Sequence, residues 1–155
     1  MPDIKDIWLY ANNIIRSSRQ MVNDGLRPMG LSSAEGNILL HLFTGDTKIR
    51  QEDLSLQLDI SKPAVSRALD SLESKGYVLR EKDPVDRRVS RVILTQKARK
   101  IESRLEDVYN WVFSVAARGV SEEEIQEFIK LFGRVSESFT GARPKKGAGG
   151  DRLDG

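Results

Sequence analysis

The sequence predicts a mainly α-helical protein with one small β-hairpin. Through most of the chain, apolar residues recur at steps of three and four, the spacing of one face of a helix. Residues 77–82 and 89–94 are instead rich in strand formers. They flank a polar segment that contains Pro84 and two aspartates, which is typical of a hairpin tip.

The first part of the chain is expected to form two helices. Residues 4–24 place apolar side chains on one side of a helix, and Gly25, Pro28 and Gly30 are expected to end it. Ser32 and Glu35 have the spacing of a capping box at the start of the second helix. Gly45 is expected to end that helix, whose core face holds Ile38, Leu39, Leu42 and Phe43.

Two short helices are expected next, after a brief strand or loop at residues 48–49. Residues 51–58 form the first, Asp59 lies in the turn, Ser61 caps the second and Gly76 ends it. Pro63 is tolerated in the first turn of the second helix. Helix, turn, helix and hairpin in this order predict a winged helix-turn-helix, whose second helix is built to enter the major groove of DNA.

The C-terminal part is expected to be helical as well. A long helix is predicted from Thr95 to about Gly119, and Ser121 and Glu124 form a second capping box before the last helix. From residue 141 onward the apolar content is too low for packing, which predicts a disordered basic tail over residues 141–155. We therefore expect one unit at residues 1–140. It has a DNA-binding lobe at 31–95 and a helical dimerisation lobe built from both termini, at 4–25 and 96–140.

The overall charge says little about DNA binding. The chain has 25 Lys and Arg against 23 Asp and Glu, a net charge of +2. Residues 141–155 hold four of these cations and two of the anions, so 4 − 2 = +2 and residues 1–140 are neutral. A DNA-binding function must therefore rest on where charges are placed.

Composition excludes several other classes of protein. The chain has no cysteine, which excludes disulfides, thiolate metal sites and a cysteine redox switch. No apolar run approaches the ~20 residues of a membrane span, and the N-terminal segment does not resemble a secretory signal. We expect a cytoplasmic protein without a membrane partner.

The second helix of the pair carries the first candidate site. Its polar faces hold Ser61, Lys62, Ser66 and Arg67. Small hydroxyl groups allow close approach to a groove, and the cations can bond guanine O6 and N7 or phosphate. The N-terminus of the helix also points free N–H groups at a phosphate backbone. The alternative is an ordinary solvated helix face.

The hairpin tip carries the second candidate site. Residues 80–91 contain five cations and three anions. An arginine on a projecting tip can enter the minor groove, where narrow A·T-rich stretches concentrate negative potential. Asp86 lies two residues before Arg88 and can hold its guanidinium through a bidentate bond. The alternative is a soluble hairpin that its charges protect from edge-to-edge pairing.

Three motifs make the interpretation specific. L-S-S-A-E at residues 31–35, L-D-I-S-K-P-A-V-S-R at 58–67 and D-P-V-D-R-R at 83–88, followed by V-I-L-T, resemble the MarR family of bacterial transcription regulators. The resemblance covers about residues 5–140. It implies a homodimer that binds a palindromic operator in double-stranded DNA and is often released by a small, frequently aromatic ligand. The resemblance also implies that Ser61, Lys62, Ser66 and Arg67 meet the major groove and that Arg88, supported by Asp86, reaches the minor groove. We expect four further residues to contact DNA: Ser32, Arg50, Pro63 and Arg87.

The chain departs from the family pattern at three positions. Asp59 stands in the turn where many such proteins have glycine, although Asp tolerates a left-handed backbone. Arg50 stands where Ser or Thr would cap the helix better, and Ala98 replaces a common glycine. These changes affect local geometry and remove no DNA-contacting type of residue.

The terminal helices have more apolar surface than a domain of this size can cover by itself. This surface predicts a subunit interface that includes Ile4, Ile7, Trp8, Phe128, Phe132 and Phe139. The alternative is a bundle packed within one chain.

A ligand site would lie between the dimerisation helices and the DNA-binding lobe, as the resemblance implies. Its candidates are Trp8, Asn12, Ile15, His41 and Trp111. His41 is the only histidine, and without a second histidine or a cysteine we expect neither a metal nor another cofactor.

Three functional classes were compared. The sequence favours a dimeric, ligand-responsive DNA-binding regulator, expected to be a repressor. The alternative is a winged-helix protein-interaction module without specific DNA binding. An enzyme is not expected, because we find no nucleophile–histidine arrangement and no glycine-rich phosphate cradle.

Overall fold

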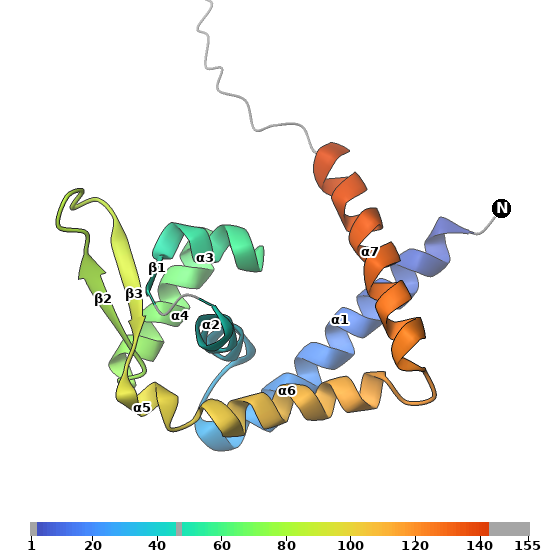
Figure 1. The fold of residues 1–155 in the computed structure, drawn as a ribbon, viewed down its shortest axis with the longest axis horizontal. Helices are drawn as coiled ribbons and strands as arrows, with labels where there is room; N and C mark the ends of the chain where they lie inside the picture. The colour runs from blue at the N-terminus through green and yellow to red at the C-terminus, as the bar shows by residue number, and fades with distance from the viewer. Residues whose placement is uncertain (1–2, 46–47, 143–155) are drawn as a thin grey trace, which may run out of the picture. The chain divides into compact units, whose positions relative to one another are not determined.

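The computed structural model describes residues 3–45 and 48–142 and divides into two compact units, residues 1–115 and 116–155. The chain is mainly helical with one small antiparallel sheet, which confirms the predicted fold class (Figure 1). The first unit contains α1 (Ile4–Leu26), the short 3-10 helix η1 (Arg27–Met29), α2 (Ser33–Thr44), β1 (Lys48–Arg50), α3 (Gln51–Leu58), α4 (Lys62–Ser74), β2 (Val78–Lys82), β3 (Ser90–Leu94), α5 (Gln96–Arg99) and α6 (Glu102–Ala116), which ends at the boundary. The second unit contains α7 (Glu122–Ala142).

The hydrophobic core lies in the first unit. Its buried side chains come from all the α-helices of that unit and from β2 and β3, beginning with Val22 on α1 and ending with Leu105 on α6. The inward face of α4 has four buried residues: Val65, Ala68, Leu69 and Leu72. By contrast, α7 has no buried residue. Within the described residues, no helix is both long enough and apolar enough to cross a membrane.

The three strands form a sheet in the order β1-β3-β2, with both pairs antiparallel. Residues 48–49, for which a brief strand or a loop was expected, lie in β1 (Lys48–Arg50), which pairs with β3. The hairpin of β2 and β3, with the tip at residues 83–89, is called the wing. It projects from the helices at the left of Figure 1.

Most of the predicted helix ends are confirmed. Residues 51–58 are α3, and Asp59 after it has φ 49°, the left-handed backbone expected of this turn. The Ser61 hydroxyl accepts the backbone N–H of Ala64 and caps α4. Ser121 and Glu124 form a reciprocal capping box before α7. At α2 the Ser32 hydroxyl caps as expected, but the Glu35 carboxylate binds Lys75 of the segment after α4.

Gly25 does not end the first helix, contrary to the prediction. α1 continues through it to Leu26, and the chain turns only in η1 and at Gly30, which has φ 67°. A Cβ atom at Gly25 would lie 2.6 Å from Cγ1 of Val108. The glycine is therefore used for close packing of α1 against α6.

The predicted continuous helix from Thr95 to Gly119 is also wrong. It is two helices, α5 and α6, separated at residues 100–101. Ala98 is buried at the end of α5, and the Arg99 guanidinium binds both carboxylate oxygens of Glu102 across the break, at 3.2 and 3.1 Å. The apolar spacing continues across the break, so periodicity alone did not reveal it.

The predicted tail overlaps the end of α7, which includes Gly141 and Ala142. The remainder of the tail, residues 143–155, lies outside the described residues.

Candidate nucleic-acid interface

The polar side of α4 is open to solvent. Lys62, Pro63 and Arg67 are exposed and Ser66 is half-buried, whereas the opposite side of the helix is in the core. Ser61 is exposed and has its hydroxyl directed at the first turn, as the cap of the helix. The first two turns of α4 therefore present two cations and small polar groups around a helix N-terminus, which favours anions.

Asp83 organises the wing tip. Its Oδ1 accepts the backbone N–H groups of Val85 (2.9 Å) and Asp86 (3.1 Å), and its Oδ2 accepts Nε of Arg91 (3.0 Å). The two backbone N–H groups, followed by Arg91, lower the pKa of Asp83 to about 2. The tip is closed by its own hydrogen bonds, including one from Asp83 N–H to the carbonyl of Val89 at 2.9 Å.

The predicted pair of Asp86 and Arg88 is confirmed. Nε and one terminal nitrogen of Arg88 donate to the two carboxylate oxygens of Asp86, at 3.2 and 3.4 Å. The same carboxylate accepts the backbone N–H of Arg88 at 3.1 Å, and the guanidinium is the main cause of its lowered pKa. The Arg88 side chain is still 92% exposed. Its guanidinium is thus held in one orientation while remaining accessible to a ligand.

A hollow of about 250 Å³ separates the helix pair from the wing. Three cations from different elements line it: Arg50 before α3, Lys62 on α4 and Arg88 on the wing. Glu52 is the one carboxylate among its lining residues, which otherwise are Gln51, Ser55, Val65, Val89 and Ser90. Sequence reasoning missed Gln51 and Ser55, although their spacing of four places them on one face of α3. Three converging cations suit an anionic group such as a phosphate.

Three of the five cations in residues 80–91 form ion pairs within the protein, and two of these three, unlike the exposed Arg88, have side chains that are mostly covered. Arg80 binds Asp70 and Glu73 of α4, and Arg91 binds Asp83. Arg87 and Lys82 are exposed. The five cations counted in residues 80–91 of the sequence therefore overstate the positive charge that the wing can present to DNA.

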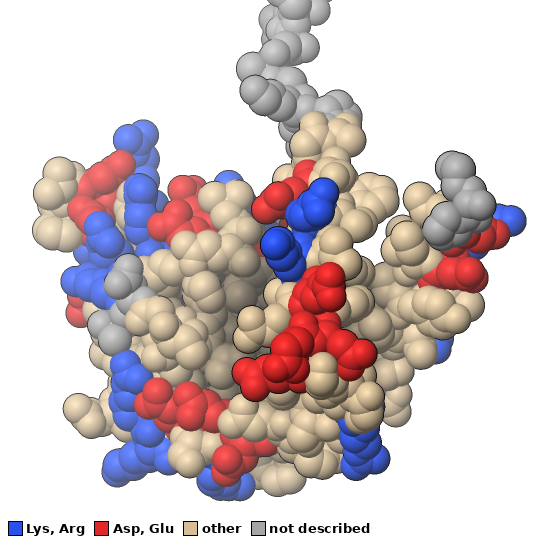
Figure 2. Space-filling model, turned by 45° about the vertical axis from the view of Figure 1, so that its right-hand side comes forward, with Lys and Arg blue, Asp and Glu red and all other residues tan. Residues whose placement is uncertain are grey.

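Ser32 lies apart from the residues that line this hollow. It is the N-cap of α2, and its exposed side chain accepts the backbone N–H of Glu35. Figure 2 shows Lys and Arg interspersed with Asp and Glu at the left of the molecule. No single continuous positive face is visible there, in keeping with the neutral charge of residues 1–140.

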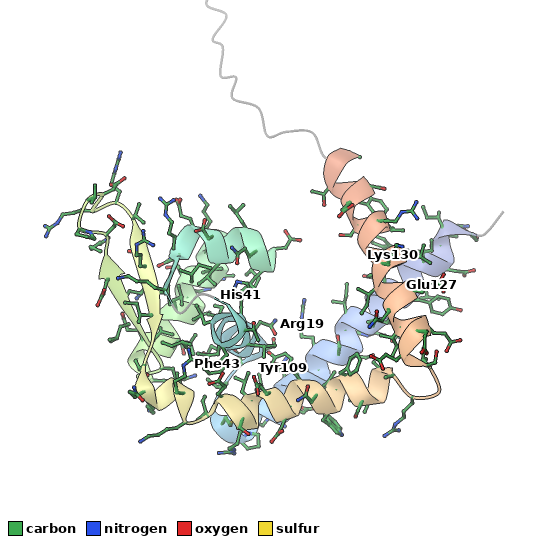
Figure 3. The ribbon with its side chains drawn as sticks, viewed as in Figure 1. Arg19, His41, Phe43, Tyr109, Glu127 and Lys130 are labelled. Carbon is green, nitrogen blue, oxygen red and sulfur yellow. The ribbon has the colours of Figure 1, made fainter. Side chains whose placement is uncertain are left out.

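The residues proposed for a ligand site are only partly brought together. Ile15 lines a hollow of about 320 Å³ between α1, α2 and α6, together with Arg19, Asn37 and Tyr109. Figure 3 labels Arg19 on α1 and Tyr109 on α6. The Tyr109 hydroxyl donates to Oδ1 of Asn37 at 2.6 Å, and burial raises the pKa of Tyr109. The other candidates do not line this hollow: Trp8, Asn12, His41 and Trp111. His41 contacts Gln57 of α3, and both tryptophans are more than half exposed.

The predicted interface residues are exposed in the single chain. On α1, Ile4, Ile7 and Trp8 are 67%, 47% and 72% exposed. On α7, Phe128, Phe132 and Phe139 are 53%, 44% and 59% exposed, and the rings of the first two stack at 5.2 Å. Each helix therefore has an uncovered apolar side, of the kind that marks an interaction surface.

Comparison with known proteins shows similarity to MarR regulators in sequence and in fold. A sequence model described as the MarR family matches residues 29–89. A MarR transcriptional regulator from Methanosarcina mazei Go1 is 26% identical, with a TM-score of 0.81 over 90% of this chain and 99% of that chain. The transcriptional regulator PA3341 is 27% identical, with a TM-score of 0.78 over 87% of this chain and 98% of that chain. A mutant MarR from E. coli, crystallised with operator DNA, is 22% identical and similar in fold, with a TM-score of 0.76 over 85% of this chain and 94% of that chain.

Proposed function

We propose that this chain, a member of the MarR family by its sequence motifs and its fold, is a homodimeric, cytoplasmic repressor that binds a palindromic DNA operator. The family membership predicted from the sequence is confirmed by the family match and by the solved structures of MarR regulators. We propose further that a small ligand releases the protein from DNA, and that the protein has no catalytic activity.

The arrangement of α4 and the wing carries this proposal. In the proposed complex α4 is the recognition helix, and Lys62, Ser66 and Arg67 face the major groove. The wing places Arg88 in the adjacent minor groove, and Asp86 restricts its side chain before binding, which lowers the entropy lost on contact. The backbone phosphate between the two grooves would occupy the hollow lined by Arg50, Lys62 and Arg88.

The uncovered apolar sides of α1 and α7 support the proposed dimer. Large apolar side chains on both helices are about half exposed or more, and a second copy of the chain would remove them from water. A two-fold dimer presents two recognition helices to two half-sites, which accounts for a palindromic operator.

The proposed effector site is the hollow between α1, α2 and α6. It combines apolar side chains with Arg19, Asn37 and Tyr109, a lining that suits a small aromatic acid. A ligand there would contact helices of the dimerisation lobe and α2 of the DNA-binding lobe together. It would release DNA if it favoured a spacing of the two recognition helices that does not fit the operator.

The test is binding of the purified protein to the promoter region of its own gene across a salt series. We expect sequence-specific binding by a dimer, which weakens steeply with salt because each neutralised phosphate contributes about −0.9 to the slope of log K against log salt. Absence of binding at low salt, even to bulk DNA, would exclude the repressor. It would favour a winged-helix module that binds another protein.

A further inference from the structure

The wing is attached to α4 by an ion-pair cluster that the proposed DNA contacts do not use. One terminal nitrogen of Arg80, on β2, donates to Oδ1 of Asp70 at 2.5 Å and to Oε1 of Glu73 at 3.0 Å. Both acceptors belong to α4. Oε2 of Glu73 accepts the backbone N–H of Arg80, also at 3.0 Å. The Glu73 carboxylate therefore binds Arg80 twice: one oxygen accepts from the Arg80 side chain and the other from the Arg80 backbone N–H.

The position of β2 in the sheet makes this attachment important. β2 pairs with β3 alone, so its other edge is free within the described sheet. The backbone N–H of Arg80 points to that edge, where Glu73 receives it. Without the Glu73 carboxylate, the β2 edge of the wing loses two of its three hydrogen bonds to α4 and keeps only the one from Arg80 to Asp70, so the hairpin has greater freedom to twist.

The charge of the cluster argues against a direct contact with DNA. Two carboxylates surround one guanidinium, so the cluster has a net charge of −1. The Arg80 side chain is only 24% exposed. Arg80 keeps the pKa of Glu73 below its usual value, chiefly through the side-chain hydrogen bond, so the pair remains ionised at neutral pH. A negative cluster beside a phosphate backbone opposes binding, so its contribution to DNA recognition must be geometric.

We propose that Arg80 is a positioning residue that, through Glu73 and Asp70, holds the wing at a fixed place relative to α4. The effect of this attachment on DNA binding rests on the proposed function. In that function, Arg88 on the wing and Arg67 on α4 occupy adjacent grooves together, which requires a set separation between them. The attachment itself is a property of the free protein.

The first experiment measures the attachment without DNA. Because the chain has no cysteine, nitroxide labels attach only at introduced ones, Val85→Cys at the wing tip and Ser74→Cys at the end of α4. Labelled chains are diluted with unlabelled ones, and distances are read by pulsed electron double resonance. Glu73→Ala should broaden the distance distribution. The matched control Glu81→Ala removes a carboxylate from the same strand whose one ion-pair partner among the described residues is Lys48, at 3.6 Å, and it should not broaden the distribution. An unchanged distribution in Glu73→Ala overturns the proposal.

The second experiment measures DNA affinity for the same variants without labels. Glu73→Ala removes a negative charge near DNA, so electrostatics alone predicts tighter binding of every sequence. Positioning predicts that operator affinity falls by about tenfold, while affinity for unrelated DNA stays constant or rises. Operator binding that is unchanged or tighter refutes the positioning role. If Glu73→Ala does not fold, Glu73→Gln is measured with the same expectation.

Arg80→Ala separates positioning from contact. We expect a loss of operator affinity in Arg80→Ala, a loss in the double variant that is smaller than the sum of the two single losses because both single variants remove the bond between Arg80 and Glu73, and a salt slope equal to that of the wild type. A slope smaller by about one per half-site would mean that Arg80 touches a phosphate, which overturns the proposal. If the wild type itself bound no DNA, the proposed function would fail, and the distance measurement would still decide whether the attachment exists.

Discussion

Arg88→Ala provides the most direct test of the wing's contact with DNA. The side chain is 92% exposed, and within the described residues its ion-pair partner is Asp86, which is itself half-exposed. Exposed ion pairs contribute about 0–1 kcal/mol to stability. The substitution should therefore leave folding almost unchanged and act on DNA binding alone.

The expected magnitude follows from the loss of one groove arginine in each half-site. Such a contact is worth about 1–3 kcal/mol, and about 1.4 kcal/mol corresponds to a factor of ten. Each half-site should lose affinity by a factor of about 5 to about 140, and both half-sites are affected in a dimer. The control is Arg104→Ala, which removes an exposed cation from α6, away from the wing, and should change operator affinity little.

The assay is an operator titration at fixed salt, with unfolding measured in parallel. If Arg88→Ala binds the operator as tightly as the wild type does, the wing does not read the minor groove. An equal loss in the Arg104→Ala variant would instead attribute the effect to net charge. Asp86→Ala distinguishes orientation from charge, because it leaves Arg88 in place but removes the carboxylate that holds it.

Three further predictions concern pH, packing and assembly. The pKa of Asp83 is lowered from 3.8 to about 2, so its ionised form stabilises the folded wing above pH 4; this contribution is lost as pH falls from about 4 to about 2, and thermal melts of Asp83→Asn should show a weaker pH dependence in that window. Gly36→Ala would place a Cβ atom 2.3 Å from Cδ1 of Leu26, and should lower the free energy of unfolding by about 1–3 kcal/mol in a denaturant titration. Phe132→Glu places a charge on the exposed apolar side of α7 and should yield a folded monomer in sedimentation; a dimer of unchanged affinity would remove this side of α7 from the interface.

Features set by neighbouring residues were predicted well from the sequence. The bounds of α3, the Ser61 cap, the left-handed Asp59 and the reciprocal box before α7 all depend on residues within a few positions of one another. The pair of Asp86 and Arg88 belongs to the same class, since its members are two positions apart in the sequence. Local chemistry was sufficient in each of these cases.

The family motifs placed the candidate site on α4 and the wing, but they did not reveal which cations are free. Arg80 and Arg91 look like available charges in the sequence, yet Arg80 is captured by α4 and Arg91 by Asp83. Asp70 and Glu73 are ten and seven residues away from Arg80 and lie on another element. Whether these side chains come into contact depends on how β2 packs against α4.

By itself, the sequence determined the succession from helix pair to wing, the Ser61 cap, the box before α7 and the polar side of α4, because hydrophobic spacing and capping act over one or two turns of chain. The tertiary structure decided that Gly25 lies within a helix, that α5 and α6 are separate and that Arg80 binds α4. The role of Gly25 depends on a distant segment, because a Cβ atom there would collide with Val108, 83 positions along the chain. A residue's role in packing is set by its neighbours in space, and those exist only once the chain has folded.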